Sequence, residues 1–140
     1  MEIRSPQEGD ARALVMLAAE AVGGLRAAGI VRSHLERGGL LVAEDEDHEL
    51  VGLVAFRDDW FECTFVGLVV VAESARRRGL ARALMQAVER RASGPRLFAS
   101  VEETNTVAIR MLRALDFAPS GHVDNLPQGY RELLFYKRIR

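Results

Sequence analysis

One short apolar run in the middle of the chain, residues 65–71, constrains the fold more than any other feature of the sequence. It reads Phe-Val-Gly-Leu-Val-Val-Val, and valine favours β-strands. A strand that is apolar on both faces is usually central in its sheet and covered by helices. The run is far shorter than the roughly 20 residues that a membrane-spanning helix needs. The sequence therefore predicts an α/β fold.

Helical periodicity and turn residues divide the rest of the chain into further elements. Ala11, Leu14, Val15 and Ala18 recur at the spacing of one helical face, and Ser5-Pro6 before them is a helix-start signal. Further helices are expected at 31–37, 79–91 and 104–115, and strands at 2–4, 40–43, 50–56, 65–71, 96–101, 117–123 and 132–137. This order predicts one domain over residues 1–140, with a mixed α/β sheet of about six to seven strands, one strand–helix–strand crossover and about four helices.

The composition is that of an ordinary globular domain, with 49% apolar and 28% charged residues. Cys63 is the only cysteine, so no intramolecular disulfide can form and a reducing, cytoplasmic setting is expected. The N-terminus lacks the apolar core of a signal peptide.

The net charge of −1 conceals a division along the chain. Residues 1–75 hold 6 basic and 14 acidic side chains, whereas residues 76–140 hold 13 basic and 6 acidic ones. This division suggests that the basic half binds an anionic ligand and that the acidic half attracts a cationic one. The alternative is that the charges serve solubility alone.

The segment from residue 69 to residue 82 carries the clearest functional signal. A buried strand leads into the basic turn Arg76-Arg77-Arg78, then Gly79, then a helix. The free N–H groups of a helix N-terminus and the positive end of its dipole attract anions. Gly79 lets a phosphate approach the backbone, and Arg82 adds a further positive charge.

This segment resembles the GNAT superfamily of acyl-CoA-dependent N-acyltransferases, whose signature Gln/Arg-x-x-Gly-x-Gly/Ala is matched from Arg76 to Ala81. The later segment from Asn105 to Phe117 resembles a second conserved element of that family. The resemblance implies a GNAT-like, mostly antiparallel sheet with one parallel crossover, and acetyl-CoA as co-substrate. It also implies a cofactor site composed of Val69, Val70, Val71, Arg76, Arg77, Arg78, Gly79, Leu80, Ala81, Arg82 and Asn105.

The chain departs from the family pattern at three positions. Leu112 stands where many members carry the Tyr that protonates the leaving thiolate, which puts the general acid in doubt. Asp116 replaces a common Gly, and Asp tolerates the left-handed conformation better than most residues. Glu73 stands where the usual Pro follows the central strand.

The transfer also requires a base, because an amine is mostly protonated at neutral pH. The candidates, in order, are Glu62 before the central strand, then Glu103 and Glu102 after the next strand. Tyr130 and Tyr136 are candidates for the missing acid, with ordinary packing as the alternative. A backbone N–H near Val69 is expected to meet the oxyanion of the tetrahedral intermediate.

Other residues carry weaker signals. Cys63 as a nucleophile has no supporting feature, and the three histidines are too scattered to predict a metal site. Trp60-Phe61 beside Asp58-Asp59 is consistent either with a pocket for an amine or with ordinary loop packing. The acidic run 44–47 is interpreted as a solvated turn, with attraction of a cationic substrate as the alternative. For Asn105, which the resemblance places at the cofactor arm, a helix cap is the alternative.

These observations favour an N-acetyltransferase that moves an acetyl group from acetyl-CoA to a primary amine of a small molecule or peptide in a ternary complex. A catalytically weak acyl-CoA-binding sensor is the alternative, because of Leu112. A nucleic-acid-binding domain is disfavoured by the sequence pI of about 6.3. A homodimer is plausible because the final strands are edges that need protection.

Overall fold

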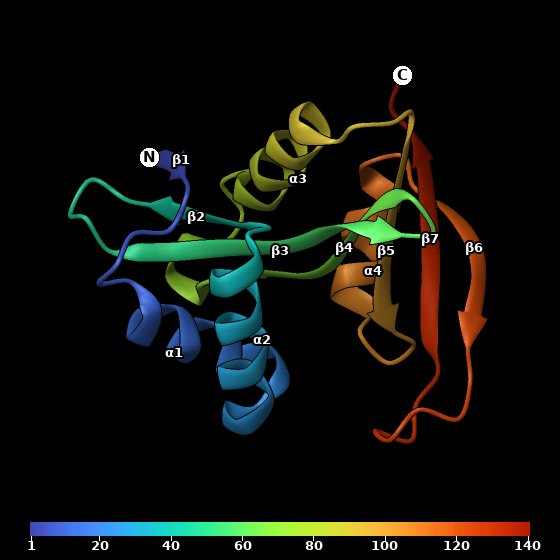
Figure 1. The fold of residues 1–140 in the computed structure, drawn as a ribbon, viewed down its shortest axis with the longest axis horizontal. Coiled ribbons are helices and arrows are strands. Elements are labelled where there is room, and N and C mark those ends of the chain that lie inside the picture. Colours follow the sequence, from blue (N-terminus) through green and yellow to red (C-terminus); the bar gives the residue numbers. More distant parts are fainter. The chain divides into compact units, whose positions relative to one another are not determined.

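The computed structural model covers residues 1–140 and contains seven strands and four α-helices. The helices are α1 (Ala11–Val22), α2 (Gly24–Arg37), α3 (Leu80–Arg91) and α4 (Thr106–Ala114), with a 3₁₀ turn η1 (Glu73–Ala75). The strands are β1 (Glu2–Arg4), β2 (Leu40–Glu44), β3 (Leu50–Trp60), β4 (Cys63–Val71), β5 (Arg96–Glu102), β6 (Ala118–Val123) and β7 (Glu132–Arg138). They form one mixed sheet in the order β1-β2-β3-β4-β5-β7-β6, in which β4 and β5 are parallel (Figure 1). The predicted fold class is therefore confirmed.

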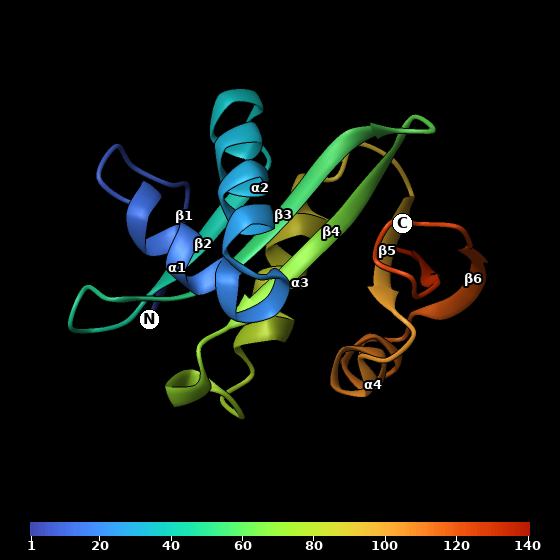
Figure 2. The ribbon, with the colours of Figure 1, turned by 90° about the horizontal axis from the view of Figure 1, so that it is seen from below.

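The chain forms two compact units. The first consists of Met1–Phe56 and Leu68–Arg90, and the second of Arg57–Gly67 and Arg91–Arg140. In the first unit, α1 and α2 lie on one side of β2 and β3, and α3 lies on the other (Figures 1 and 2). The core between α1, α2 and the strands is aliphatic and contains Leu14, Leu17, Ala18, Ala27, Val31, Leu40, Val42, Leu53, Ala55 and Val70.

Two of the predicted helix starts are wrong. α1 begins at Ala11 with Asp10 as its N-cap residue, and not at Ser5-Pro6, because the Asp10 carboxylate accepts the N–H of Gln7 and closes a turn there. α2 begins at Gly24 and not at residue 31, because Gly23, with φ +82°, reverses the chain directly between the two helices. Burial of Ala27 and Val31 then outweighs the weak helix propensity of the first turn.

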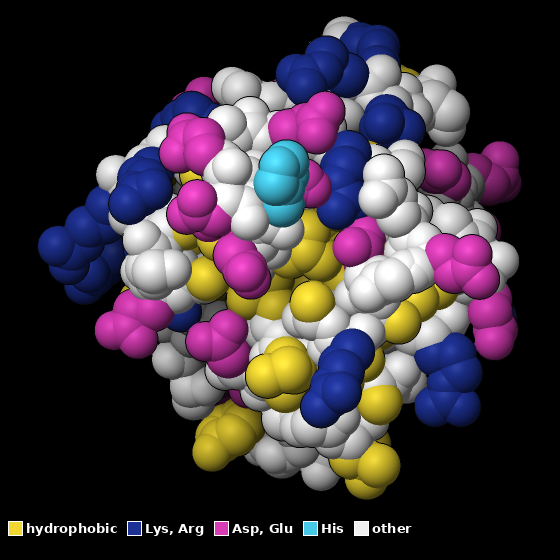
Figure 3. Space-filling view, turned by 90° about the vertical axis from the view of Figure 1, so that its left-hand side faces the viewer, with side chains coloured by type: hydrophobic (Ala, Val, Ile, Leu, Met, Phe, Trp, Pro, Cys, Tyr) yellow, Lys and Arg dark blue, Asp and Glu magenta, His cyan; other side chains and the backbone are white.

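The predicted hairpin at residues 40–56 is present, and its acidic turn has a local structural role. The Asp45 carboxylate accepts the N–H groups of Asp47 and Glu49, each at 2.9 Å, so it organises the turn as an Asx motif. Figure 3 views the side on which β1 and this turn lie, and acidic side chains gather there. Within the acidic run, Glu46 and Asp47 are therefore exposed in the turn, whereas Glu44 at the end of β2 is largely covered.

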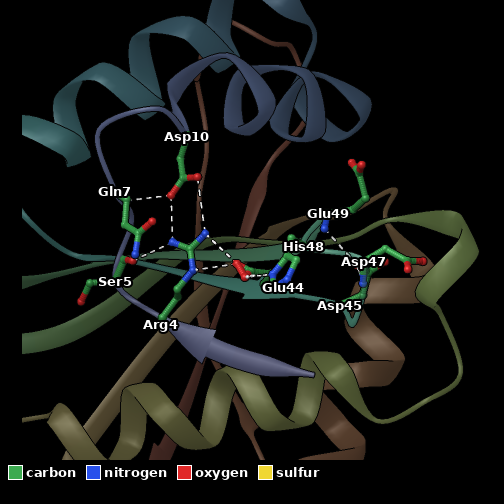
Figure 4. A network of polar contacts seen from close by, with 9 residues as sticks. All are labelled: Arg4, Ser5, Gln7, Asp10, Glu44, Asp45, Asp47, His48 and Glu49. Carbon is green, nitrogen blue, oxygen red and sulfur yellow. Dashed lines mark hydrogen bonds and ion pairs between the residues drawn. The ribbon is translucent and has the colours of Figure 1, made fainter.

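A guanidinium connects the first strand, the first helix and the end of β2 (Figure 4). Arg4 Nη1 donates to Asp10 Oδ2 at 2.9 Å, and Arg4 Nε donates to Glu44 Oε1 at 3.2 Å. All three side chains are largely covered, with exposed fractions of 14–16%. The hydrogen bond from Arg4 lowers the pKa of Asp10, and hydrogen bonds from His48 and Arg4 lower the pKa of Glu44.

We expect Arg4→Gln to lower Tm at pH 7 by roughly 3–6 °C, because two covered carboxylates lose their shared cation. A depressed carboxylate pKa stabilises the fold above the pKa of the unfolded state, and this contribution is lost as the pH falls through the folded value. The Tm difference from wild type should therefore shrink below about pH 4. Melts between pH 7 and pH 4 test this, with the exposed Arg12→Gln on α1 as a matched control. An equal effect of both variants would contradict the assignment.

In the second unit, β5 pairs with β7 from Arg96↔Arg138 to Glu102↔Glu132, and β6 pairs with the outer side of β7. α4 ends in a Schellman motif, in which Phe117 N–H donates to the Leu112 carbonyl and Asp116 N–H to the Arg113 carbonyl, both at 3.0 Å. Asp116 has φ +70°, so the left-handed conformation predicted for it is confirmed.

Candidate functional site

The turn between β4 and α3 is shaped by two residues with positive φ. Arg77 has φ +67° and Gly79 has φ +77°. Before them, Arg76 Nε donates to the Val71 carbonyl at 3.0 Å, which fastens the turn to the end of β4. The first backbone bond of α3 runs from Ala83 N–H to the Gly79 carbonyl at 3.0 Å, so the preceding amides lie at the free end of the helix.

This turn has the electrostatics of an anion site. The side chains of Arg76, Arg77 and Arg78 are exposed, and the first turn of α3 contains no acidic residue. A Cβ added at Gly79 would meet no heavy atom within 4 Å, so the space in front of its backbone is open. The residues present therefore fit a phosphate-bearing ligand held by amides, the helix dipole and guanidinium groups.

The end of β4 presents alternating side chains beside this turn. Val70 is buried in the core of the first unit, whereas Val69 and Val71 are half-buried. The Val71 carbonyl already accepts from Arg76, and Ala72 N–H donates to the Val51 carbonyl at 2.8 Å. The Val71 carbonyl therefore already has a partner within the turn.

Two of the predicted catalytic residues lie in one neighbourhood of the second unit. Glu103 accepts the Arg131 N–H at 2.9 Å, and its own N–H donates to the Arg131 carbonyl at 3.0 Å. These contacts fasten the segment after β5 to the loop before β7, in which Tyr130 precedes Arg131 and is 50% exposed. The backbone of Tyr130 is therefore one residue away from the contact between Glu103 and Arg131.

Glu62, the first-choice base, lies far from Glu103. It occupies the two-residue turn between β3 and β4, where Phe61 and Glu62 have φ +50° and +63°. Thr64 pairs with Leu97 at the start of β5, and Glu103 follows the end of that strand at Glu102. Five residues of extended strand span about 17 Å, so the two carboxylates cannot act on one reacting amine.

Asn105 and Leu112 both have structural roles in α4. Asn105 is the N-cap residue, and its side-chain oxygen accepts the Ala108 N–H at 3.1 Å, which leaves the side-chain nitrogen for any ligand. Leu112 is 2% exposed, so the position where many relatives carry Tyr is part of the core in this chain. No hydroxyl group replaces it at that point of the helix.

The remaining candidates show no sign of metal or nucleophile chemistry. Cys63 is half-buried at the start of β4. His34 contacts the Ile30 carbonyl, His48 contacts Glu44 and His122 contacts Asp124, so each histidine has its own local partner. The structure contains no group of three His, Cys, Asp or Glu side chains arranged to hold a metal ion. None of its helices combines the length and apolar character that crossing a membrane requires.

The aromatic pair before β4 belongs to a larger cluster. Trp60 is half-buried and stacks on Phe65 with ring centroids 4.9 Å apart, whereas Phe61 is 82% exposed. The ring centroid of Phe98 on β5 lies 5.0 Å from that of Trp60 and 5.4 Å from that of Tyr136 on β7. Sequence reasoning found the first pair and missed Phe98, because the register of the strands is not readable from the sequence.

Sequence reasoning also missed a polar pair on β5 and β7. Ser100 Oγ donates to Glu132 Oε2 at 2.7 Å, and both side chains are half-buried. The alternation of Phe98 and Ser100 along β5 is visible in the sequence, but their pairing with β7 depends on the long connection through residues 103–131.

Comparisons with known proteins agree on one family. The sequence model described as "Acetyltransferase (GNAT) family" matches residues 12–117. An acetyltransferase of that family from Bacillus cereus is similar, with 25% identity, a TM-score of 0.84 and coverage of 98% of this chain and 96% of that one. None of the curated proteins matches the chain.

Two other solved structures share the fold. Ribosomal-protein-alanine N-acetyltransferase from Brucella melitensis has 23% identity and a TM-score of 0.72, with 99% of each chain covered. The putative acetyltransferase yncA from Salmonella typhimurium, solved with its cofactor acetyl-CoA, has 20% identity and a TM-score of 0.76, covering 100% of this chain and 94% of that one.

Proposed function

This chain belongs to the GNAT acetyltransferase family, and we propose that it is an N-acetyltransferase that moves an acetyl group from acetyl-CoA to a primary amine. The observation that carries the proposal is the turn before α3, where Gly79 leaves open space in front of the helix amides and three arginines surround it. The acetyl-CoA named in the structure of yncA and the N-acetyltransferase named from Brucella support the choice of donor and acceptor.

We assign the pyrophosphate of acetyl-CoA to the amides from Arg77 to Arg82, with Arg76, Arg77, Arg78 and Arg82 as the positive groups of the segment. The pantetheine arm would pair with the backbone of Val69 and Val70 and contact the Asn105 side-chain nitrogen. This arrangement uses the strand end, the turn and the helix start in the order in which the chain presents them.

The thioester supplies the electrophilic carbonyl carbon and a thiolate leaving group. The amine nitrogen forms a bond to that carbon and the C–S bond breaks, while Glu103 accepts the amine proton and the Tyr130 hydroxyl donates a proton to sulfur. We choose Glu103 over Glu62 because it follows the carboxyl end of a parallel strand, where ligands of α/β sheets bind, and contacts Arg131, the residue after Tyr130. A backbone N–H near Val69 would stabilise the oxyanion.

The separation of the two carboxylates makes the choice of base testable. We expect Glu103→Gln to lower kcat by about 100-fold at neutral pH, because positioned proton transfer contributes about 10²–10⁴-fold. Glu62→Gln is the matched control and should change kcat by less than about two-fold. The measurement is the initial rate of thiol release at saturating acetyl-CoA. The opposite pattern would place the reaction at the β3–β4 turn.

Binding of acetyl-CoA is tested by thermal melts with and without the ligand. A ligand at about 100 times its Kd stabilises the folded state by roughly 2.7 kcal/mol, and for a chain of this size Tm should rise by roughly 3–5 °C. Coenzyme A without the acetyl group should give a similar rise, because the proposed contacts are to the phosphates and the pantetheine arm. An unchanged Tm in a folded sample would refute the proposed donor.

A second function, an acyl-CoA-binding sensor without turnover, is favoured by the buried Leu112 in place of a catalytic phenol. It predicts the same rise in Tm and no thiol release with any amine. We also propose a cytoplasmic location and a homodimer, the latter because the edge strand β6 is exposed along its whole length.

A further inference from the structure

One face of the second unit's sheet carries a continuous row of aromatic side chains. Phe65 pairs with Phe98, and Phe98 pairs with Tyr136, so the three rings lie side by side on adjacent strands. Side chains alternate between the faces of a strand, so this row lies opposite the face that carries the buried Leu97 and Phe135. All three rings are half-buried, which leaves part of the row accessible to a ligand.

The same face carries a half-buried carboxylate. Ser100 follows Phe98 by two residues on β5, and Glu132 precedes Tyr136 by four residues on β7, so both point to the aromatic side of the sheet. The Ser100 hydroxyl fixes one oxygen of Glu132 at 2.7 Å, and none of the ion pairs of the structure includes Glu132. A negative charge is thus held in place without a cation.

A second carboxylate lies at that end of the face. Glu102 lies directly opposite Glu132 in the β5–β7 register. The combination of carboxylates with the π faces of nearby rings is the chemistry that recognises an ammonium group on an apolar body.

We propose that this face binds the acyl acceptor, and that the acceptor is a small molecule with a primary ammonium on an aromatic or aliphatic body. Glu132 holds the ammonium, and Phe98 and Tyr136 hold the body. Glu132 and Tyr136 are four residues apart on β7, a spacing of about 13 Å along the strand, which suits an amine separated from its ring by several carbons. This inference rests on the proposed acetyl transfer and specifies the class of its acceptor.

The single tryptophan provides a direct probe, because Trp60 contacts both Phe65 and Phe98. We would titrate 4-phenylbutylamine in the presence of coenzyme A and record Trp60 fluorescence, with 4-phenylbutanol as the neutral analogue. The amine should give a saturable change, and the alcohol should bind about ten-fold more weakly or not at all. Equal binding of amine and alcohol, or no change with the amine, would overturn the proposal.

Two variants assign the binding to the named residues. Glu132→Gln keeps an acceptor for the Ser100 hydroxyl and should weaken amine binding about ten-fold or more, whereas Glu36→Gln on α2 should leave it unchanged. In turnover, Glu132→Gln should raise KM for the amine with little change in kcat. Phe98→Leu should weaken amine and alcohol alike. Unaltered amine affinity in Glu132→Gln, with the variant folded by its melt, would refute the role of this carboxylate.

The same samples separate this inference from the proposed function. A normal rise of Tm with acetyl-CoA together with a silent Trp60 refutes the acceptor face alone. No rise of Tm with acetyl-CoA refutes the transferase itself, whatever the amine does. Binding of a tetrapeptide with a free N-terminal phenylalanine in preference to 4-phenylbutylamine would replace the small-molecule acceptor with a peptide.

Discussion

Alanine at position 39 should destabilise the protein by about 3 kcal/mol or more, because of both a steric clash and backbone strain. Gly39 lies between α2 and β2 with φ +86°, and a Cβ there would overlap the backbone carbonyl oxygen of Phe56. The two backbone segments are held together, because Phe56 N–H donates a hydrogen bond to the Gly39 carbonyl at 2.8 Å. They therefore cannot separate to make room for the added Cβ. Urea unfolding should show a markedly lower midpoint.

The preceding residue supplies the control for this prediction. Gly38 has almost the same φ, +85°, but a Cβ there would meet no heavy atom within 4 Å. Gly38→Ala should therefore cost only the conformational strain, about 1–3 kcal/mol for φ 85° and ψ −173°, and less than Gly39→Ala. Equal destabilisation by the two variants would show that the close approach of Gly39 to β3 is not what requires glycine.

Gly79→Glu should weaken acetyl-CoA binding by about 100-fold or more. The added carboxylate would stand in front of the helix amides, repel the pyrophosphate and pair with the neighbouring arginines. Because the space around Gly79 is open, the fold can accommodate the glutamate side chain. The backbone strain of a non-glycine residue at φ +77° should lower the free energy of unfolding by about 1–2 kcal/mol. Isothermal titration with acetyl-CoA measures the loss of affinity, and a melt without ligand measures the cost to folding.

A matched glycine separates ligand repulsion from strain. Gly121 on β6 also has a positive φ, +97°, and open surroundings. Gly121→Glu introduces the same charge and similar strain away from the turn, so it should bind acetyl-CoA with wild-type affinity. Wild-type binding by Gly79→Glu, or equal loss in both variants, would place the phosphates elsewhere.

Local signals in the sequence were sufficient to predict most of the elements and the position of the turn before α3. The apolar run before Arg76 predicts a buried strand, and glycine between arginine and a helical pattern predicts a helix start with free amides. The left-handed residue after α4 was also predictable, because Asp at position 116 is one of the few non-glycine residues that suit it.

Contacts between distant parts of the chain could not be predicted in this way. The start of α1 depends on Asp10, whose carboxylate is engaged by Gln7 and by Arg4 from β1. The choice between Glu62 and Glu103 depends on the register of β4 with β5, and the Ser100–Glu132 pair depends on the register of β5 with β7. Strand register is a tertiary property, since it is set by packing and connections rather than by local propensity.

The most direct test of the transferase is a rate measurement that requires both substrates. Purified protein is mixed with acetyl-CoA and 4-phenylbutylamine, free thiol is followed over time, and the amine is examined by mass spectrometry. The account predicts thiol release that depends on amine, an equal amount of N-acetylated amine, and loss of both in Gly79→Glu. Saturable acetyl-CoA binding without thiol release or acetylated product, across a panel of aryl- and alkylamines, would contradict it.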